Sequence, residues 1–180
     1  MDNMQKKVKP IDPFDQQSYV IDSLEDEIRA DNTCKVLLQQ FHSYLLKNKL
    51  IFPLEAGSMA SGADYYLRDF MIDNRRTNIF AISPELVRSF AGNWYIINTL
   101  EPNMGELESI LIGISHFYRF CAAKKIVNSA IADEIHHACT LTDYYQQRIE
   151  SFNAISGDGF IAWNSNCPLP QIKDNRVSNH

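Results

Sequence analysis

Apolar side chains recur along much of this chain at intervals of three and four residues, the spacing of an amphipathic helix. The clearest case is the stretch 103–125, whose apolar positions form one broad stripe. These positions are Leu107, Ile110, Leu111, Ile114, Phe117, Tyr118 and Cys121. Asn103 and Glu106 have the spacing of a capping box, and Lys124 and Lys125 suit the negative end of the helix dipole. The stretch is therefore predicted to be a helix that buries one face in a core.

The same spacing predicts further helices. Their expected ranges are 16–29, 31–47, 61–74, 83–101 and 128–152. Ser83 before Pro84 has the form of a helix start, with a cap residue and then proline at the first helical position. The stretch 55–61 is expected to be flexible. Gly92 and Gly113 would weaken two consecutive helices, so we expect them to mark a close crossing of backbones.

Short connections between the last helices imply antiparallel neighbours. We predict an all-α fold, a compact antiparallel bundle of about five or six helices with irregular N- and C-terminal arms. Residues 1–14 are expected to form a flexible arm, residues 15–163 a single helical-bundle domain, and residues 164–180 a polar C-terminal tail. The apolar patch that contains Phe160, Ile161 and Trp163 is expected to fold back onto the bundle.

Composition narrows the classes of function. The chain has 180 residues and a formal net charge of −5, so no overall basic excess points to nucleic acid. No run reaches the roughly 18 apolar residues of a membrane-spanning helix, and we expect no membrane partner. The four cysteines have no CxxC spacing, and we interpret them as free thiols in a reducing compartment. These features predict a cytoplasmic location.

Tyrosine and arginine side chains gather in and just after the helix predicted over residues 61–74. They are Tyr65, Tyr66, Arg68, Arg75 and Arg76. Such side chains anchor partner surfaces and stack on bases. A solvated helix face, with an ion pair between Asp64 and Arg68, explains the same pattern without a partner. The leading hypothesis is a non-catalytic cytoplasmic helical domain that acts through protein association, with a protein partner or as a homo-oligomer.

A second hypothesis is a nucleic-acid-associated helical module. Its contact residues would be Arg75, Arg76, Arg119, Lys124 and Lys125. These cations would have to converge on one face, because affinity for nucleic acid comes mainly from neutralising phosphates.

A third hypothesis is a helical bundle that binds a metal or a small ligand. Glu134 and His137 have the Glu-x-x-His spacing of di-iron bundles, and His116 on the preceding helix could complete a mononuclear site. The motif occurs once rather than twice, so a polar helix face explains it more simply. Because the chain lacks a nucleophile elbow, a phosphate-binding loop and an HExxH motif, we name no catalytic residue and expect no cofactor.

One tract carries a resemblance to a known family. Leu107-x-x-Ile110-Leu111 leads to His116-Phe117-Tyr118-Arg119-Phe120, and the basic turn Lys124-Lys125-Ile126-Val127 precedes another helix. In this pattern residues 83–149 resemble the helical core-binding (SAM-like) domain of tyrosine recombinases. The resemblance implies a helical clamp on DNA, with which the acidic net charge fits poorly. The stretch after residue 149 is too short for the catalytic domain of that family, so strand cleavage is not implied.

Overall fold

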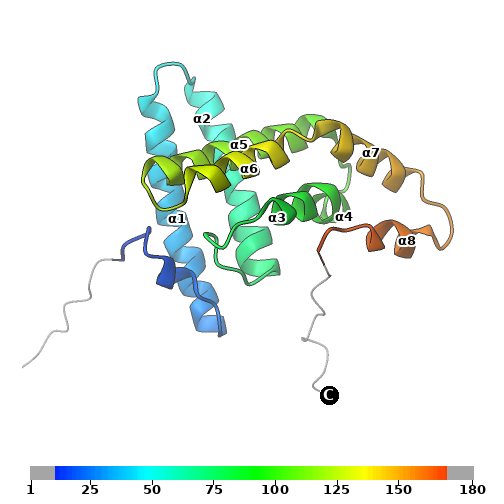
Figure 1. The fold of residues 1–180 in the computed structure, drawn as a ribbon, viewed down its shortest axis with the longest axis horizontal. Helices are drawn as coiled ribbons and strands as arrows, with labels where there is room; N and C mark the ends of the chain where they lie inside the picture. Colours follow the sequence, from blue (N-terminus) through cyan, green and yellow to red (C-terminus); the bar gives the residue numbers. More distant parts are fainter. Residues whose placement is uncertain (1–10, 170–180) are drawn as a thin grey trace, which may run out of the picture.

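The computed structural model describes residues 11–169, and every regular element in that range is a helix (Figure 1). The prediction of an all-α fold is confirmed. Most of the predicted arm 1–14 and most of the predicted tail 164–180 lie outside the described residues. At the end of the arm, Pro13 is buried and the ring of Phe14 packs against that of Phe120.

Helix α1 (Leu24–Lys47) follows one 3-10 turn, η1 (Gln16–Tyr19), whereas the sequence predicts two helices that meet near residue 30. That division is wrong. Ser23 and Asp26 form a capping box, in which each side chain accepts the backbone N–H of the other residue. No proline or glycine interrupts the chain from there to Lys47, so the helix runs through the polar residues at which a second start was expected.

Helix α2 (Pro53–Asp64) continues without a break into η2 (Tyr65–Asn74), which has the wider hydrogen bonding of a π-helix. The flexibility predicted for the first part of α2 is wrong. Pro53 occupies the first turn, and the Glu55 carboxylate accepts the N–H of Phe52 at 3.0 Å. The small side chains of this helix allow α2 to approach another helix closely.

That other helix is α5 (Met104–Ala123), which crosses α2 with the two backbones in near contact. A Cβ atom on Gly62 would lie 2.8 Å from the Cα atom of Ile110. A Cβ atom on Gly113 would overlap the carbonyl oxygen of Met59. The close crossing predicted at Gly113 is therefore correct, although its partner is α2 rather than the helix that precedes α5.

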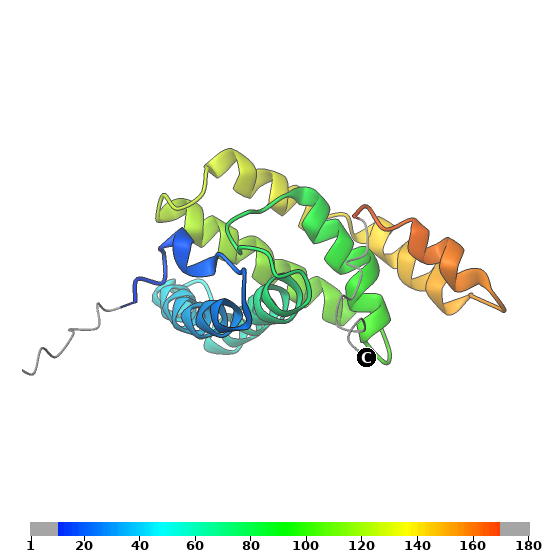
Figure 2. The same cartoon turned by 90° about the horizontal axis from the view of Figure 1, so that it is seen from below.

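The remaining helices complete two crossed layers. They are α3 (Pro84–Ser89), η3 (Phe90–Trp94), α4 (Tyr95–Asn98), α6 (Ser129–Cys139), α7 (Thr142–Asn153) and α8 (Gly159–Ser165). Figure 2 shows α1 and α2 nearly end-on in one layer, with α5 and α6 running across them. In the same view α7 and α8 form a pair at the far end of the molecule.

The single helix predicted over residues 128–152 is divided into α6 and α7. Two side chains satisfy the carbonyl groups at the end of α6. The Thr140 hydroxyl donates to the carbonyl oxygen of His137 at 2.8 Å, and the Tyr145 hydroxyl donates to that of Ala138 at 2.7 Å. The apolar spacing continues across the break, so periodicity alone does not reveal it.

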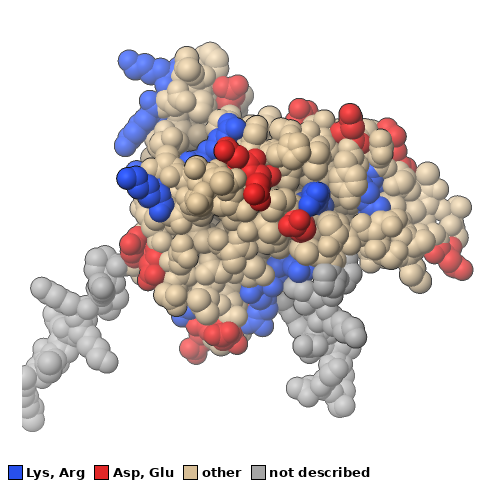
Figure 3. All heavy atoms as spheres, viewed as in Figure 1, with Lys and Arg blue, Asp and Glu red and all other residues tan. Residues whose placement is uncertain are grey.

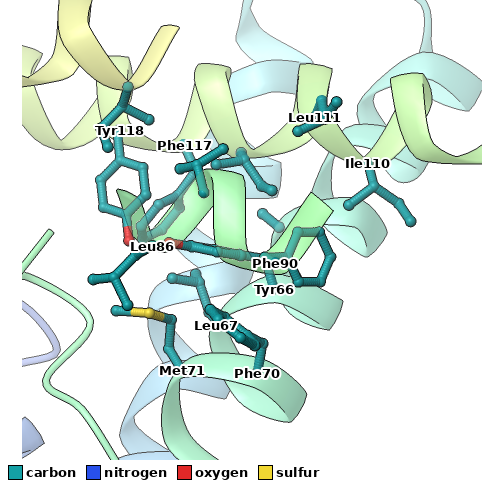
Figure 4. Packing of buried hydrophobic residues seen from close by; sticks show 14 of the residues in the cluster. Tyr66, Leu67, Phe70, Met71, Leu86, Phe90, Ile110, Leu111, Phe117 and Tyr118 are labelled. Atoms are coloured by element: carbon teal, nitrogen blue, oxygen red, sulfur yellow. The ribbon is translucent and has the colours of Figure 1, made fainter. Parts of the chain in front are cut away.

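Buried tyrosines tie the connections between helices to the core. The Tyr118 hydroxyl donates to the carbonyl oxygen of Ile79, between η2 and α3, and Tyr19 donates to that of Pro13. Each bond satisfies a loop carbonyl that burial would otherwise leave without a partner. The Tyr66 hydroxyl is buried without a hydrogen bond inside residues 11–169. Figure 4 shows Tyr66 and Tyr118 among apolar side chains of η2, α3 and α5.

Arg148 connects α7 to η3 and to α8. Its guanidinium donates to the carbonyl oxygens of Gly92 at 2.9 Å and Trp163 at 3.1 Å, and it stacks on the Trp163 indole. Gly92 therefore faces α7 and takes no part in the crossing predicted for it. Trp163 folds back as predicted, whereas Phe160 and Ile161 remain exposed.

The α2–α5 crossing can be tested by adding one methyl group. We expect Gly113→Ala to lower the free energy of unfolding by about 2–3 kcal/mol, because the new Cβ would overlap a backbone oxygen that cannot rotate away. Gly57→Ala is the matched control, since Gly57 lies in α2, the other helix of the crossing, with nothing within 4 Å of its Cβ position. It should raise stability by about 0.5–1 kcal/mol. Urea unfolding followed by circular dichroism measures both, and equal effects would contradict the proposed contact.

Candidate functional site

The tyrosines expected to form a partner surface belong largely to the core. Tyr66 is fully buried, with its ring against those of Phe90 and Tyr118. Tyr65 is half-buried and packs against the rings of Phe90 and Trp94. Burial raises the pKa of both hydroxyls above the ordinary value. Tyr66 is thus unavailable to a partner, and Tyr65 presents only part of its side chain.

Arg68 is engaged in an ion-pair network inside the molecule. Its guanidinium contacts the Asp31 carboxylate at 2.7 Å and the Asp64 carboxylate at 2.9 Å, and Lys35 contacts Asp31 at 2.8 Å. Burial alone would raise the pKa of Asp31. The hydrogen bonds and positive charges of Arg68 and Lys35 together lower it by more, so the pKa lies below its ordinary value. The Asp64–Arg68 pair expected along the helix forms, and a second carboxylate from α1 completes the network.

The predicted basic residues do not form one continuous face. Arg76 has a left-handed backbone conformation, with φ of 49°, and pairs with Glu27 of α1 at 3.4 Å. Arg75 caps η2 beside it and lines a small cavity of about 170 Å³ next to η3 and α4. Lys124 and Lys125 lie in the turn after α5. Figure 3 shows separate blue areas, over the lower part of the molecule and over its upper left end.

Two lysines share a groove between α1 and α5, which we call the lysine groove. Lys47 and Lys124 line it together with Tyr44, and its volume is about 460 Å³. Neither lysine forms an ion pair within residues 11–169. Arg119 is exposed on α5 and is not among the residues that line this groove.

The three residues considered as metal ligands do not converge. His116 is half-buried, and burial followed by the charges of Arg119 and His136 lowers its pKa. Glu134 and His137 are exposed on α6 and line a different hollow. Within the described part of the chain, no three His, Cys, Asp or Glu side chains form a group that could hold a metal ion. The geometry therefore does not support a site that combines His116 with Glu134 and His137.

Glu134 and His137 line a hollow between α3 and α6, which we call the α3–α6 groove. Its volume is about 540 Å³. The lining residues are Pro84, Arg88, Asp133, Glu134, His137, Ala138 and Leu141. Arg88 pairs with Glu85 of its own helix at 2.9 Å. Of the charged residues that line the groove, Asp133 and Glu134 form no ion pair within residues 11–169. The groove has an apolar floor and an acidic rim.

The connection between α1 and α2 and the first turn of α2 expose three large apolar side chains, a feature that the sequence reasoning missed. Leu50 is 88% exposed, Phe52 74% and Leu54 87%, and we call these three residues the apolar tip. The connection projects from one end of the molecule (Figure 1). The signal in the sequence is an apolar run, Leu50 to Leu54, that belongs to no helical stripe.

Local hydrogen bonds hold the tip in place. The Asn48 side chain accepts the N–H of Leu50 at 3.0 Å, and the Asn48 carbonyl oxygen accepts the N–H of Ile51 at 3.1 Å. The Glu55 carboxylate accepts the N–H of Phe52 at the start of α2. The exposed side chains are therefore carried on a turn and a helix start with defined backbone geometry, and Lys47 and Lys49 precede them.

Comparison with known proteins found no matching protein-family model, no matching curated protein and no matching solved structure. None of the helices in residues 11–169 is both long and apolar enough to cross a bilayer.

The Arg68 network generates a test of its electrostatics. Arg68→Gln should lower the free energy of unfolding by about 1 kcal/mol at pH 7, after allowance for solvent screening. The pKa of Asp31 is lowered on folding, so its contribution is present above the unfolded pKa of about 4 and is lost as the pH falls through the folded pKa. The difference between wild type and variant should therefore shrink toward pH 3, as measured by urea unfolding across this range. Lys35→Gln, which removes the more exposed partner, should cost less. A pH-independent difference would contradict the assignment.

Proposed function

We propose that this chain is a non-catalytic helical domain that acts through protein association, with the apolar tip as its contact surface. The observation that carries the proposal is the exposure of three large apolar side chains on the hydrogen-bonded turn before α2 and on the first turn of α2. Contiguous exposed apolar surface marks interaction sites, whereas single exposed apolar residues are ordinary. The tip replaces the tyrosine and arginine surface expected from the sequence, because those side chains are occupied by internal contacts.

The geometry of the tip favours a specific contact. Its backbone is already held by turn and cap hydrogen bonds, so binding would order few additional groups. Aromatic and aliphatic side chains that enter a partner's pocket commonly dominate interface energies. Phe52 and its neighbours would supply such an anchor.

The cysteines support the non-catalytic and cytoplasmic parts of the proposal. Cys34, Cys121 and Cys139 are buried free thiols. Burial raises the pKa of each, and that of Cys139 to about 12, so they remain protonated near neutral pH and are poor nucleophiles. Free buried thiols are typical of proteins in a reducing compartment.

Photocrosslinking tests the proposed contact. A photoreactive phenylalanine analogue in place of Leu50 should give a discrete protein adduct in a lysate of the native cells, and mass spectrometry should identify it. The same analogue in place of Leu100, which is fully exposed on another loop, is the matched control and should give no such adduct.

Adding Leu54→Asp to the probe variant should reduce the adduct by about tenfold or more, because a charge would enter the anchor. Circular dichroism must confirm that this exposed substitution leaves the fold intact. Equal labelling from both probe positions, or no protein adduct from Leu50, would contradict protein association through the tip.

We propose nucleic-acid binding as a second candidate, supported by the lysine groove. Lys47 and Lys124 lie beside the exposed ring of Tyr44, which combines cations for phosphates with a surface for base stacking. The resemblance of residues 83–149 to a DNA-clamping domain stands as part of the same proposal.

A gel-shift titration at low salt, with single-stranded and duplex oligonucleotides, separates this candidate from protein association. Lys47→Glu combined with Lys124→Glu should abolish any complex, and salt should weaken the wild-type complex with a slope of about −0.9 for each phosphate contacted. Arg76→Gln is the control, because Arg76 is engaged with Glu27 and should contribute little. Failure of the wild type to shift either oligonucleotide would rule out this candidate.

A further inference from the structure

We infer that the occupant of the α3–α6 groove is the apolar tip of a second copy of this chain. The inference rests on the proposed function, since it names the partner of the tip. It follows from two surfaces of the same molecule that are complementary in shape, apolar character and charge. One is convex, apolar and flanked by lysines, and the other is hollow, with an apolar floor and an acidic rim.

The apolar parts are matched in kind and size. The tip offers Leu50, Phe52 and Leu54 to solvent, and the groove offers Pro84 and Leu141. A hollow of about 540 Å³ lies within the range that encloses drug-sized ligands, so it has room for large side chains from the tip. Seating the tip there would remove apolar surface from water on both copies.

The charges are also matched. Lys47 and Lys49 flank the tip, and neither forms an ion pair within residues 11–169. Asp133 and Glu134 on the groove rim are likewise without an ion pair in that range, and Arg88 is occupied by Glu85. Figure 3 shows basic side chains at the end where α1 and α2 meet and acidic side chains over α6. Charge complementarity of this kind sets partner and orientation more than it sets affinity.

A second copy fits the tip better than an anionic membrane does. Net charge does not distinguish the two, because a second copy and an anionic membrane are both negative, but only the second copy offers an apolar hollow of matched size beside its acidic residues. The groove of a second copy supplies both the apolar contact and the local negative charge that the tip lacks.

The contact should be weak and concentration-dependent. Three side chains of this size offer less than about 600 Å², which is below the roughly 800 Å² per partner of a standard stable interface. Tip and groove are different surfaces, so the contact is heterologous. A single contact leaves one tip and one groove unoccupied, unless the two copies exchange tips in a closed, reciprocal dimer.

Sedimentation velocity of the purified full chain over a wide concentration range tests the inference. The wild type should show a mass that rises with concentration. Lys49→Glu beside the tip and Glu134→Lys in the groove should each weaken association by about tenfold. An equimolar mixture of these two variants should form a heterologous contact in which the reversed charges pair. Glu101→Lys, an exposed acid outside the groove, is the matched control and should leave association unchanged.

Leu50→Ser reports on the apolar part of the contact and should reduce association more than either charge reversal. All substituted side chains are exposed, and circular dichroism verifies that each variant folds. A crosslink from position 50 to residues of α6 in a second copy would support the inference directly.

Three results would overturn it. A chain that stays monomeric while position 50 crosslinks to a different protein refutes the second copy but leaves protein association standing. A monomer that binds phosphatidylserine vesicles, and loses binding with Leu50→Ser, refutes both proposals and makes the tip a lipid contact. Association that no tip or groove variant weakens shows that copies meet through other surfaces.

Discussion

The close crossing of α2 and α5 is the constraint on which the other contacts depend. Gly62 and Gly113 let the two backbones meet, so α5 lies directly across the α1–α2 layer. With α5 in that position, Phe117 reaches Phe41 of α1, and Tyr118 reaches the carbonyl oxygen of Ile79 in the loop before α3. A side chain at either glycine would separate the layers and disturb all of these contacts together.

The same crossing explains why the tip is exposed. Helices α1 and α2 pack against α5 over parts of their length, and the turn that joins them extends beyond that contact (Figure 1). Hydrogen bonds from Asn48 and Glu55 satisfy the turn's backbone, which leaves Leu50, Phe52 and Leu54 with no role in the core. Exposed apolar side chains that the core does not use are available for contact with a partner.

Sequence reasoning identified the candidate site only in part. It found Glu134 and His137 on one helix face, because residues three apart in a helix are neighbours whatever the fold. It expected Tyr66 at a surface because of its residue type, whereas the packing of η2 against α3 and α5 buries that ring. Lys47 and Lys124 line one groove because α1 lies against α5. Residue spacing within a helix cannot predict such a contact between distant segments.

The sequence by itself determined that this protein is built from amphipathic helices, with starts such as Ser83–Pro84 and Asn103, because periodicity and capping are local properties. It also marked Gly113 as a place of close approach. Only the tertiary structure decided that Arg68 forms ion pairs with carboxylates of the same molecule and that η3 contacts α7 at Gly92. It also decided that the α1–α2 turn is exposed to solvent. Those outcomes depend on which faces meet across long stretches of chain, and packing between distant segments outweighs local preference wherever the two compete.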